Sequence, residues 1–127
     1  MPPKFESYGL KGLRLLIAED EFLLAIMLEQ DLQSCGCSTL GPFGGLAQAT
    51  QAARDEPFDC AILDVNLNGE AVFPLADELV ARAVPFVFLS GYSKAHLPER
   101  FRTRPRVSKP YDLETLVKEI ARSRIAS

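Results

Sequence analysis

Five short runs, three of them of mainly apolar side chains, are separated by stretches in which apolar residues recur every three or four positions. The runs predict β-strands, and three of them are typical of strands buried on both faces of a sheet. They cover residues 13–18, 38–40, 60–63, 84–89 and 106–108. The three-to-four periodicity predicts helices with one buried face. These are expected over residues 21–35, 46–54, 73–83 and from 113 onward, with only a short helix in the polar stretch 94–104.

Several details of these elements can be predicted as well. The glycines and the proline of residues 41–45 indicate a turn after the second strand. In the third helix we expect Leu75, Leu79 and Val80 to point inward. Asp112 precedes the last helix and is expected to cap its amino end.

Alternation of strands and helices is typical of the α/β class, here a doubly wound five-stranded parallel sheet with helices on both faces. In such sheets ligands bind beyond the carboxyl ends of the strands. Glu19–Asp20, Asp64, Ser90 and Lys109 each follow a predicted strand directly. We therefore expect these side chains to meet at one edge of the sheet.

The expected cluster has a particular chemistry. Three carboxylates brought together repel one another unless a cation lies between them, and a hard divalent cation such as Mg²⁺ prefers oxygen ligands. A lysine opposite them supplies a positive charge for a phosphoryl oxygen, and a serine hydroxyl supplies a hydrogen bond. Asp64 is the best nucleophile, because carboxylates form aspartyl-phosphates and it stands alone at the end of its strand.

In order and position, Glu19–Asp20, Asp64, Ser90 and Lys109–Pro110 resemble the receiver domain of bacterial two-component response regulators. The resemblance covers residues 12–124, which leaves 1–11 as an N-terminal extension and 125–127 as a C-terminal tail. It implies a flavodoxin-like fold with strand order 2-1-3-4-5. It also implies that Asp64 accepts a phosphoryl group from the phosphohistidine of a histidine kinase or a histidine phosphotransferase.

The resemblance assigns a role to each residue of the cluster. Asp20 and Asp64 would bind Mg²⁺ directly, the backbone carbonyl of Asn66 would be a third ligand, and Glu19 would act through a metal-bound water. Lys109 would pair with the phosphoryl group.

The same resemblance implies roles for Pro110, Ser90 and Gly91. The peptide bond before Pro110 is expected to be cis. Ser90 would move to donate a hydrogen bond to the phosphoryl oxygen. Gly91 would leave room for the incoming phosphohistidine.

Two positions set this chain apart. The family usually has an aromatic switch residue three positions before the lysine, where this chain has Arg106. In addition, residues 88–92 (Phe-Leu-Ser-Gly-Tyr) resemble a receiver subgroup with a Phe-x-Thr/Ser-Gly-Tyr motif, which often occurs as stand-alone receivers. We hypothesise that Tyr92 takes over part of the signalling or shields the phosphoryl group from water.

Charge is distributed unevenly along the 127 residues. The net charge is −3, but residues 1–89 carry 13 acidic and 5 basic side chains, and residues 90–127 carry 4 acidic and 9 basic ones. The basic part is either an ordinary solvated surface or a face for an acidic partner. The candidate tract consists of Lys94, Arg100, Arg102, Arg104 and Arg106. A pI near 5.2 argues against a dedicated nucleic-acid binder.

Other classes of protein are excluded by composition and length. No apolar run approaches the roughly 20 residues that cross a bilayer. The segment Met1–Glu6 lacks the pattern of a secretion signal, so we expect a cytoplasmic protein that contacts no membrane. The three cysteines, Cys35, Cys37 and Cys60, make neither a disulfide framework nor a four-ligand zinc site.

The leading hypothesis is therefore a phosphorylatable module without enzymatic activity beyond its own phosphorylation and dephosphorylation, which signals through protein contacts. A phosphate sink and a phosphorelay intermediate are alternatives. An aspartate-nucleophile phosphohydrolase would need a second acid two residues after Asp64, where this chain has Asn66. A receiver-shaped binding module that is never phosphorylated is a third reading, which the intact cluster disfavours. The kinase and the downstream target are not identified, and a homodimer is left open.

Overall fold

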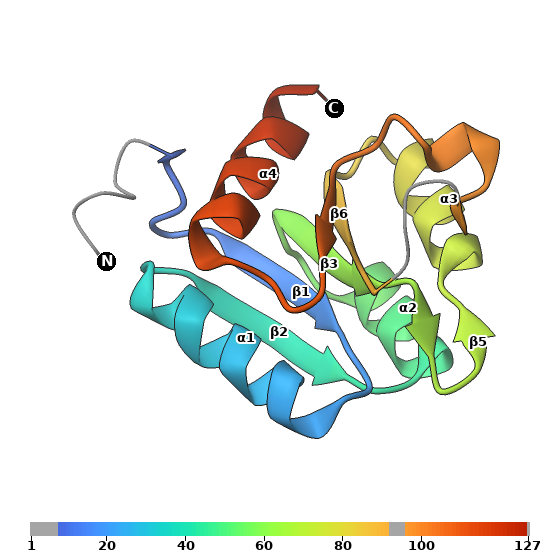
Figure 1. Cartoon of the computed structure of the whole chain (residues 1–127), viewed down its shortest axis with the longest axis horizontal. Coiled ribbons are helices and arrows are strands. Elements are labelled where there is room, and N and C mark those ends of the chain that lie inside the picture. Colours follow the sequence, from blue (N-terminus) through green and yellow to red (C-terminus); the bar gives the residue numbers. More distant parts are fainter. Residues whose placement is uncertain (1–7, 92–95, 127) are drawn as a thin grey trace.

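The computed structural model describes residues 8–91 and 96–126, which form a parallel five-stranded sheet between two layers of helices (Figure 1). The strands of this sheet are β1 (Arg14–Ala18), β2 (Ser38–Phe43), β3 (Cys60–Asp64), β6 (Phe86–Ser90) and β7 (Arg106–Ser108). Their order is β2-β1-β3-β6-β7, which confirms the predicted 2-1-3-4-5 arrangement. All four pairings are parallel, so the carboxyl ends of the strands meet at one edge.

Within the described ranges, four α-helices cover the sheet. They are α1 (Phe22–Ser34), α2 (Leu46–Asp55), α3 (Phe73–Ala81) and α4 (Leu113–Ala126). Helices α1 and α4 pack on one face, and α2 and α3 pack on the other (Figure 1). A 3₁₀ helix, η3 (Glu99–Phe101), precedes β7, and a small hairpin of β4 (Asn66–Leu67) and β5 (Glu70–Ala71) follows β3.

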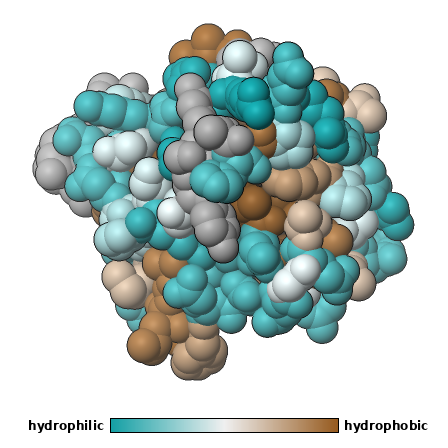
Figure 2. Space-filling view, turned by 45° about the vertical axis from the view of Figure 1, so that its right-hand side comes forward, coloured by the Kyte–Doolittle hydropathy of each residue, from teal (hydrophilic) through white to brown (hydrophobic). Residues whose placement is uncertain are grey.

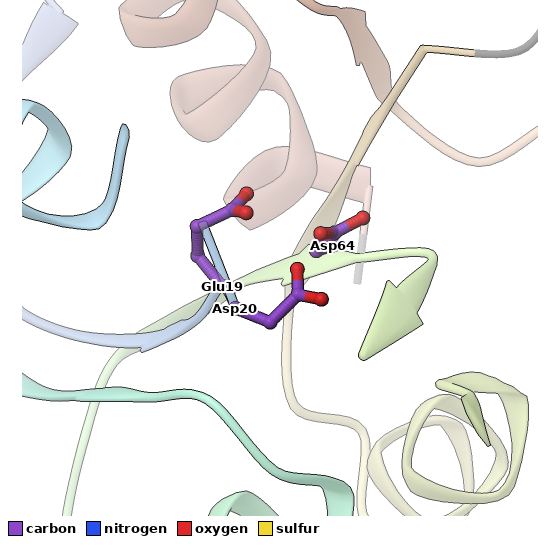
Figure 3. A group of neighbouring side chains, drawn as sticks. All are labelled: Glu19, Asp20 and Asp64. Carbon is purple, nitrogen blue, oxygen red and sulfur yellow. The ribbon is translucent and has the colours of Figure 1, made fainter. Parts of the chain in front are cut away.

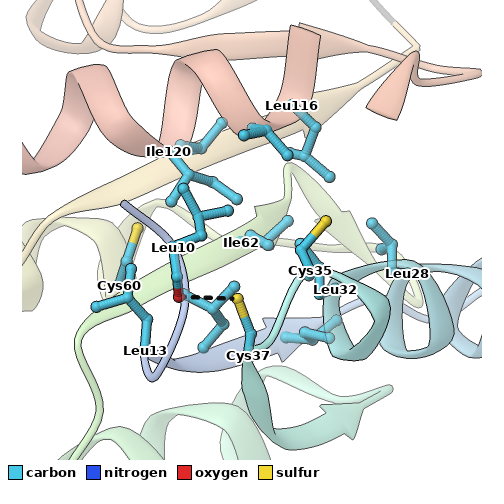
Figure 4. Packing of buried hydrophobic residues seen from close by; sticks show 14 of the residues in the cluster. Leu10, Leu13, Leu28, Leu32, Cys35, Cys37, Cys60, Ile62, Leu116 and Ile120 are labelled. Carbon is cyan, nitrogen blue, oxygen red and sulfur yellow. Dashed lines mark hydrogen bonds between the residues drawn. The ribbon is translucent and has the colours of Figure 1, made fainter. Parts of the chain in front are cut away.

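The core divides into two clusters because successive strand residues point to opposite faces. In β1, Leu15 and Ile17 face α1 and α4, whereas Leu16 and Ala18 face α2 and α3. Figure 4 shows the first cluster, in which leucines of α1 and residues of α4 meet around Ile62, with the three buried cysteines among them. Burial of each large aliphatic side chain contributes about 1.5–3 kcal/mol.

The second strand extends further than its sequence predicts. The turn signal at 41–45 does not end it, because β2 continues to Phe43 with a register irregularity opposite Leu16 and Ala18. The Gly41–Pro42 peptide bond is cis, and Gly41 has a φ of +100°. A Cβ at Gly41 would come within 2.8 Å of the Ile17 carbonyl oxygen, so glycine is required at this close approach of two strands.

The third helix is shorter than predicted. It ends at Ala81, and Val80 is 40% exposed, whereas Leu75 and Leu79 are buried as expected. The chain leaves the helix through Ala83, whose φ of 57° cannot continue it. Val80 therefore lies on the boundary of the buried face rather than within it.

The folded region extends past both ends of the expected receiver segment, 12–124. Leu10, within the expected N-terminal extension, is 1% exposed and belongs to the core cluster of α1 and α4. At the other end, α4 continues to Ala126. None of the helices in the described ranges is long and apolar enough to span a membrane.

Hydrophobic side chains are also exposed at the start of α1. Phe22 and Leu23 are each 75% exposed, and Met27 is 53% exposed. Figure 2 shows hydrophobic side chains gathered at the lower edge of the molecule, where α1 begins in Figure 1. We call these three residues the α1 apolar patch.

Candidate functional site

The predicted site residues meet at the carboxyl edge of the sheet. Glu19 and Asp20 follow β1, Asp64 is the last residue of β3, Ser90 is the last residue of β6, and Lys109 follows β7. A hollow of about 280 Å³ opens there. It is lined by Asp20, Glu21, Asp64, Asn66, Ser90, Gly91 and Lys109. The rule for parallel sheets thus brings together residues that lie up to 90 positions apart.

Three carboxylates converge in this hollow. Glu19, Asp20 and Asp64 each offer an oxygen within 4.8 Å of the others (Figure 3). Glu19 and Asp64 are buried, at 2% and 5% exposure, and Asp20 is half-buried. Such close acids repel one another unless positive charge is placed among them.

Lys109 supplies positive charge to this cluster. Its Nζ lies 2.9 Å from Asp64 Oδ2, 3.2 Å from Glu19 Oε1 and 3.1 Å from Glu21 Oε1. Burial opposes the charge of Lys109, but the hydrogen bonds to Asp64, Glu19 and Glu21 outweigh it and hold its pKa above the ordinary value. Lys109 is therefore an ammonium ion shared by three acids.

The two aspartates respond differently to their surroundings. Burial raises the pKa of Asp64 to about 7, with nearby Glu19 adding to the shift, although the hydrogen bond from Lys109 opposes it. Burial also works against the charge of Asp20, but the hydrogen bond from the Asn68 backbone N–H, at 2.9 Å, contributes to a lowered pKa. Near neutral pH the cluster thus contains one carboxylate that gives up its proton reluctantly and one that is readily ionised.

The donor set fits a divalent cation. One ammonium faces four carboxylates (Glu19, Asp20, Glu21 and Asp64), so negative charge exceeds positive charge at this edge. Glu19 Oε2 is buried and lies 3.0 Å from Lys109 Nζ, but it has no hydrogen-bond partner among the described residues. A buried, unsatisfied carboxylate oxygen is the kind of atom that a hard cation or its bound water would satisfy. The acidic cluster could therefore hold a metal ion.

The remaining predicted residues surround this centre. Ser90 is 2% exposed, and a Cβ added at Gly91 would meet nothing within 4 Å, so space is open above the carboxylates. The Lys109–Pro110 peptide bond is cis. Arg106 donates from Nη1 to Ser108 Oγ at 3.3 Å. Tyr92 lies outside the described residues, as does Lys94 of the basic tract.

A cluster of aromatic rings packs behind β6, on the side of α3. Phe88 lies 5.3 Å from Phe101 and 5.2 Å from Phe86, measured between ring centroids. Phe73 stacks on Phe101 at 5.5 Å. These four rings connect η3 and α3 to the strand that ends at Ser90. In this chain, the aromatic packing behind β6 thus comes from β6, α3 and η3, while position 106 carries an arginine.

Two residues of the site were not among the sequence predictions. Glu21 contacts Lys109, and the backbone N–H of Asn68 donates to Asp20 Oδ2. The run of three acids at 19–21 was a signal for Glu21. For Asn68 the signal was the Asn68–Gly69 turn pair, and Asn68 has a φ of 51°, which asparagine tolerates better than most residues.

Solved structures of similar fold include receiver domains of response regulators. SdrG from Sphingomonas melonis Fr1 is 38% identical, with a TM-score of 0.76 over 89% of this chain and 96% of that chain. SdrG from Pseudomonas melonis Fr1 in a BeF₃-activated conformation is 40% identical, with a TM-score of 0.74 over 87% of this chain and 95% of that one. The REC domain of the Erythrobacter litoralis response regulator PhyR is 25% identical, with a TM-score of 0.75 over 91% and 92% of the two chains.

Among curated proteins, the transcriptional regulatory protein PdtaR of Mycobacterium tuberculosis is 31% identical over 111 residues, in strains CDC 1551 and H37Rv alike. The match covers 84% of this chain and 54% of PdtaR. The chain therefore spans about half the length of the curated relatives that it matches. No protein-family model matches the chain.

Proposed function

The chain belongs to the receiver domains of two-component response regulators, and from this membership we propose that Asp64 is its phosphoryl acceptor. The donor would be the phosphohistidine of a histidine kinase or a histidine phosphotransferase. One observation carries the proposal: Asp64 lies among Glu19, Asp20 and Lys109 at the open carboxyl edge of the sheet, with Lys109 Nζ 2.9 Å from its Oδ2.

The proposed transfer exchanges one bond for another. A carboxylate oxygen of Asp64 attacks the phosphorus, the phosphorus–nitrogen bond of the donor breaks, and its electron pair stays on the imidazole, which leaves in its neutral form when the second ring nitrogen carries a proton. Lys109 pairs with the phosphoryl oxygens, and Ser90 donates a hydrogen bond to one of them. Positioning and charge neutralisation supply most of the catalysis in reactions of this kind.

We further propose Mg²⁺ as the cation of the acidic cluster. Asp20, Asp64 and the backbone carbonyl of Asn66 would hold it, with Glu19 acting through a bound water. When bound, Mg²⁺ neutralises the oxygens of the transferred phosphoryl group. This assignment is supported by the excess of carboxylates over ammonium groups and by the unsatisfied Glu19 oxygen.

The proposed output is a change in protein contacts rather than turnover of a substrate. Asn66 stands where a phosphohydrolase would need an acid, so the chemistry would be limited to the phosphorylation and dephosphorylation of Asp64 itself. Ser90 would draw the loop after β6 toward the phosphoryl group, and Gly91 would admit the donor. A phosphate sink and a relay intermediate remain variants of this function, and return of the phosphoryl group to a second histidine protein would identify the relay.

Phosphorylation of Asp64 tests the proposal directly. With Mg²⁺ and a phosphorylated histidine kinase or a small phosphoramidate donor, the wild type should gain phosphate that is released in both acid and base. Asp64→Asn should gain none, while Asp55→Asn, which removes an exposed acid from α2, should behave as the wild type. Equal labelling of Asp64→Asn and wild type, or no labelling of folded wild type by either donor, would refute the assignment.

A further inference from the structure

A second hollow lies at the opposite end of the sheet. It has a volume of about 300 Å³ and opens between the amino ends of β6 and β7 and the last turns of α4. Its lining includes three arginines, two residues with hydroxyl groups and one aromatic residue: Arg100, Arg104, Arg122, Thr103, Ser123 and Phe86. Residues from η3, the following loop and α4 thus place three guanidinium groups around one cavity, far along the strands from the acidic cluster.

The three arginines are not equally neutralised. Arg100 forms two hydrogen bonds of 2.9 Å to the Asp77 carboxylate, and Arg122 lies 2.7 Å from Glu119. For Arg104, no carboxylate of the described residues lies within ion-pair distance. The cavity therefore carries a net positive charge that is centred on Arg104.

Arg104 is held in place by aromatic packing. Its guanidinium carbon lies 5.4 Å from the centre of the Phe86 ring. Phe86 is 1% exposed and lies edge-on to Phe88 and Phe101, so it offers Arg104 a fixed face. A guanidinium that is already ordered loses less side-chain entropy when it binds a ligand. Its planar set of N–H donors suits two oxygens of one oxyanion.

We propose that this cavity, which we call the Arg104 pocket, binds a small phosphorylated molecule through its phosphoryl oxygens. Arg104 would donate to the oxyanion, and Arg100 and Arg122 would offer their remaining N–H groups while keeping Asp77 and Glu119. A volume of about 300 Å³ lies at the lower end of small-ligand sites and exceeds the needs of a single phosphate, which favours a diphosphate or a phosphate ester. The site is independent of phosphorylation at Asp64.

Titration of the wild-type chain with pyrophosphate tests the Arg104 pocket. Amide shifts would be followed by NMR in a chelating buffer, at about 0.15 M salt to screen weak surface attraction. Without a divalent cation, the acidic cluster at the other end of the sheet repels the probe. We expect saturable binding with shifts confined to the amides around Phe86, Thr103, Arg104 and Ser123.

Substitutions separate this pocket from a diffuse basic surface. Arg104→Gln should weaken pyrophosphate binding by about tenfold or more, as expected for loss of a charge-assisted pair of hydrogen bonds. Arg122→Gln should weaken it to a smaller degree. Arg124→Gln removes the same charge from an exposed position of α4 outside the pocket and should change binding by less than about twofold. Absence of saturation with wild type, or equal losses for Arg104→Gln and Arg124→Gln, would overturn the proposal.

A comparison of AMP with adenosine identifies the group that is recognised. AMP should produce shifts around Arg104 and adenosine should not, because only AMP carries the oxyanion. Binding of adenosine as strong as that of AMP would also overturn the proposal, because recognition would then be independent of phosphate.

Discussion

At the scale of single residues, Asp64 lies in surroundings that disfavour its ionised form. Burial raises its pKa to about 7 in spite of the ammonium of Lys109 at 2.9 Å. A carboxyl whose pKa is higher in the folded than in the unfolded chain binds its proton more tightly when folded. The pKa of Asp64 is about 4 in the unfolded chain and about 7 in the folded one. The stability that the bound proton contributes is therefore lost as the pH rises from about 4 to about 7, and above that the ionised carboxylate destabilises the fold by its full amount.

This linkage predicts a pH-dependent effect of Asp64→Asn and of Mg²⁺. Without divalent cations, Asp64→Asn should be more stable than the wild type at about pH 8, by an amount on the order of a few kcal/mol, and the difference should shrink at about pH 5. Mg²⁺ should raise the midpoint of thermal unfolding of the wild type more at the higher pH, because the cation competes with the proton. Urea and thermal unfolding at both pH values measure this. A difference that is independent of pH would contradict the environment described for Asp64.

Glu21 lies at the edge of the same site. Its carboxylate lies 3.1 Å from Lys109 Nζ, and its side chain is 64% exposed. Lys109 must share its hydrogens between Glu21 and an incoming phosphoryl group, so Glu21→Gln should favour phosphorylation. Exposed ion pairs are worth at most about 1 kcal/mol, so the rate with a small phosphoramidate donor should rise by up to about fivefold.

The control for Glu21 is another exposed acid of this edge. Glu70→Gln changes the β4–β5 hairpin by the same charge, and among the described contacts of Lys109 no hydrogen bond involves Glu70. It should leave the rate within about twofold of wild type. An equal rise for both variants would show that net charge, rather than the Glu21–Lys109 contact, governs the rate.

At the scale of elements, the last helix depends on its first residues for stability. Asp112 Oδ2 accepts hydrogen bonds from the Thr115 backbone N–H and from the Thr115 hydroxyl, both at 3.0 Å. Asp112→Ala removes this cap from α4, which buries Leu116, Val117 and Ile120 against the sheet. The free energy of unfolding in urea should fall by about 0.5–2 kcal/mol. Asp112→Asn keeps an acceptor oxygen and should restore most of the loss, and equal losses for both would exclude a capping role.

The sequence predicted elements most reliably where burial is uniform. The strands β3 and β6 are buried along their whole length and β1 in all but its first residue, and each has a central run of apolar side chains, so a local pattern is enough to find them. The extension of β2 past Gly41–Pro42 could not be predicted, because it depends on the approach of the Ile17 carbonyl from another strand. The same holds for Val80, because its 40% exposure depends on the elements packed around α3 and not on the local pattern.

The convergence of the predicted side chains at one edge has a simple physical reason. Residues at the ends of parallel strands converge whatever the intervening sequence, so Glu19, Asp20, Asp64, Ser90 and Lys109 could be placed together from their order alone. The contact of Asn68 with Asp20 could not, because a loop between two elements has no such rule. Arg100 and Arg104 belong to the basic tract noted in the sequence, but the Arg104 pocket itself could not be predicted, because it also needs Arg122 of α4, which joins them only in the folded chain.

At the scale of the whole molecule, the two ends of the sheet differ in charge. Four carboxylates gather around one ammonium at the carboxyl edge, and three guanidinium groups surround the hollow at the amino edge. A phosphoryl donor must therefore approach a negative surface, and contacts other than charge have to favour the encounter. The α1 apolar patch lies next to that surface, because Leu23 and Met27 line a hollow together with Lys109 and Pro110.

The α1 apolar patch predicts different results with different donors. Leu23→Ser should slow transfer from a phosphorylated kinase by about tenfold, the effect expected when a buried apolar contact of about 1.4 kcal/mol is lost from an interface. Its rate with a small phosphoramidate should stay within about twofold of wild type, because a small donor needs no docking surface. Ile125→Ser removes another exposed aliphatic side chain, 86% exposed on α4, and should change neither rate. Because Leu23 is 75% exposed, its substitution should leave the fold intact, so a loss with both donors would place its role in the chemistry of the site and not in docking.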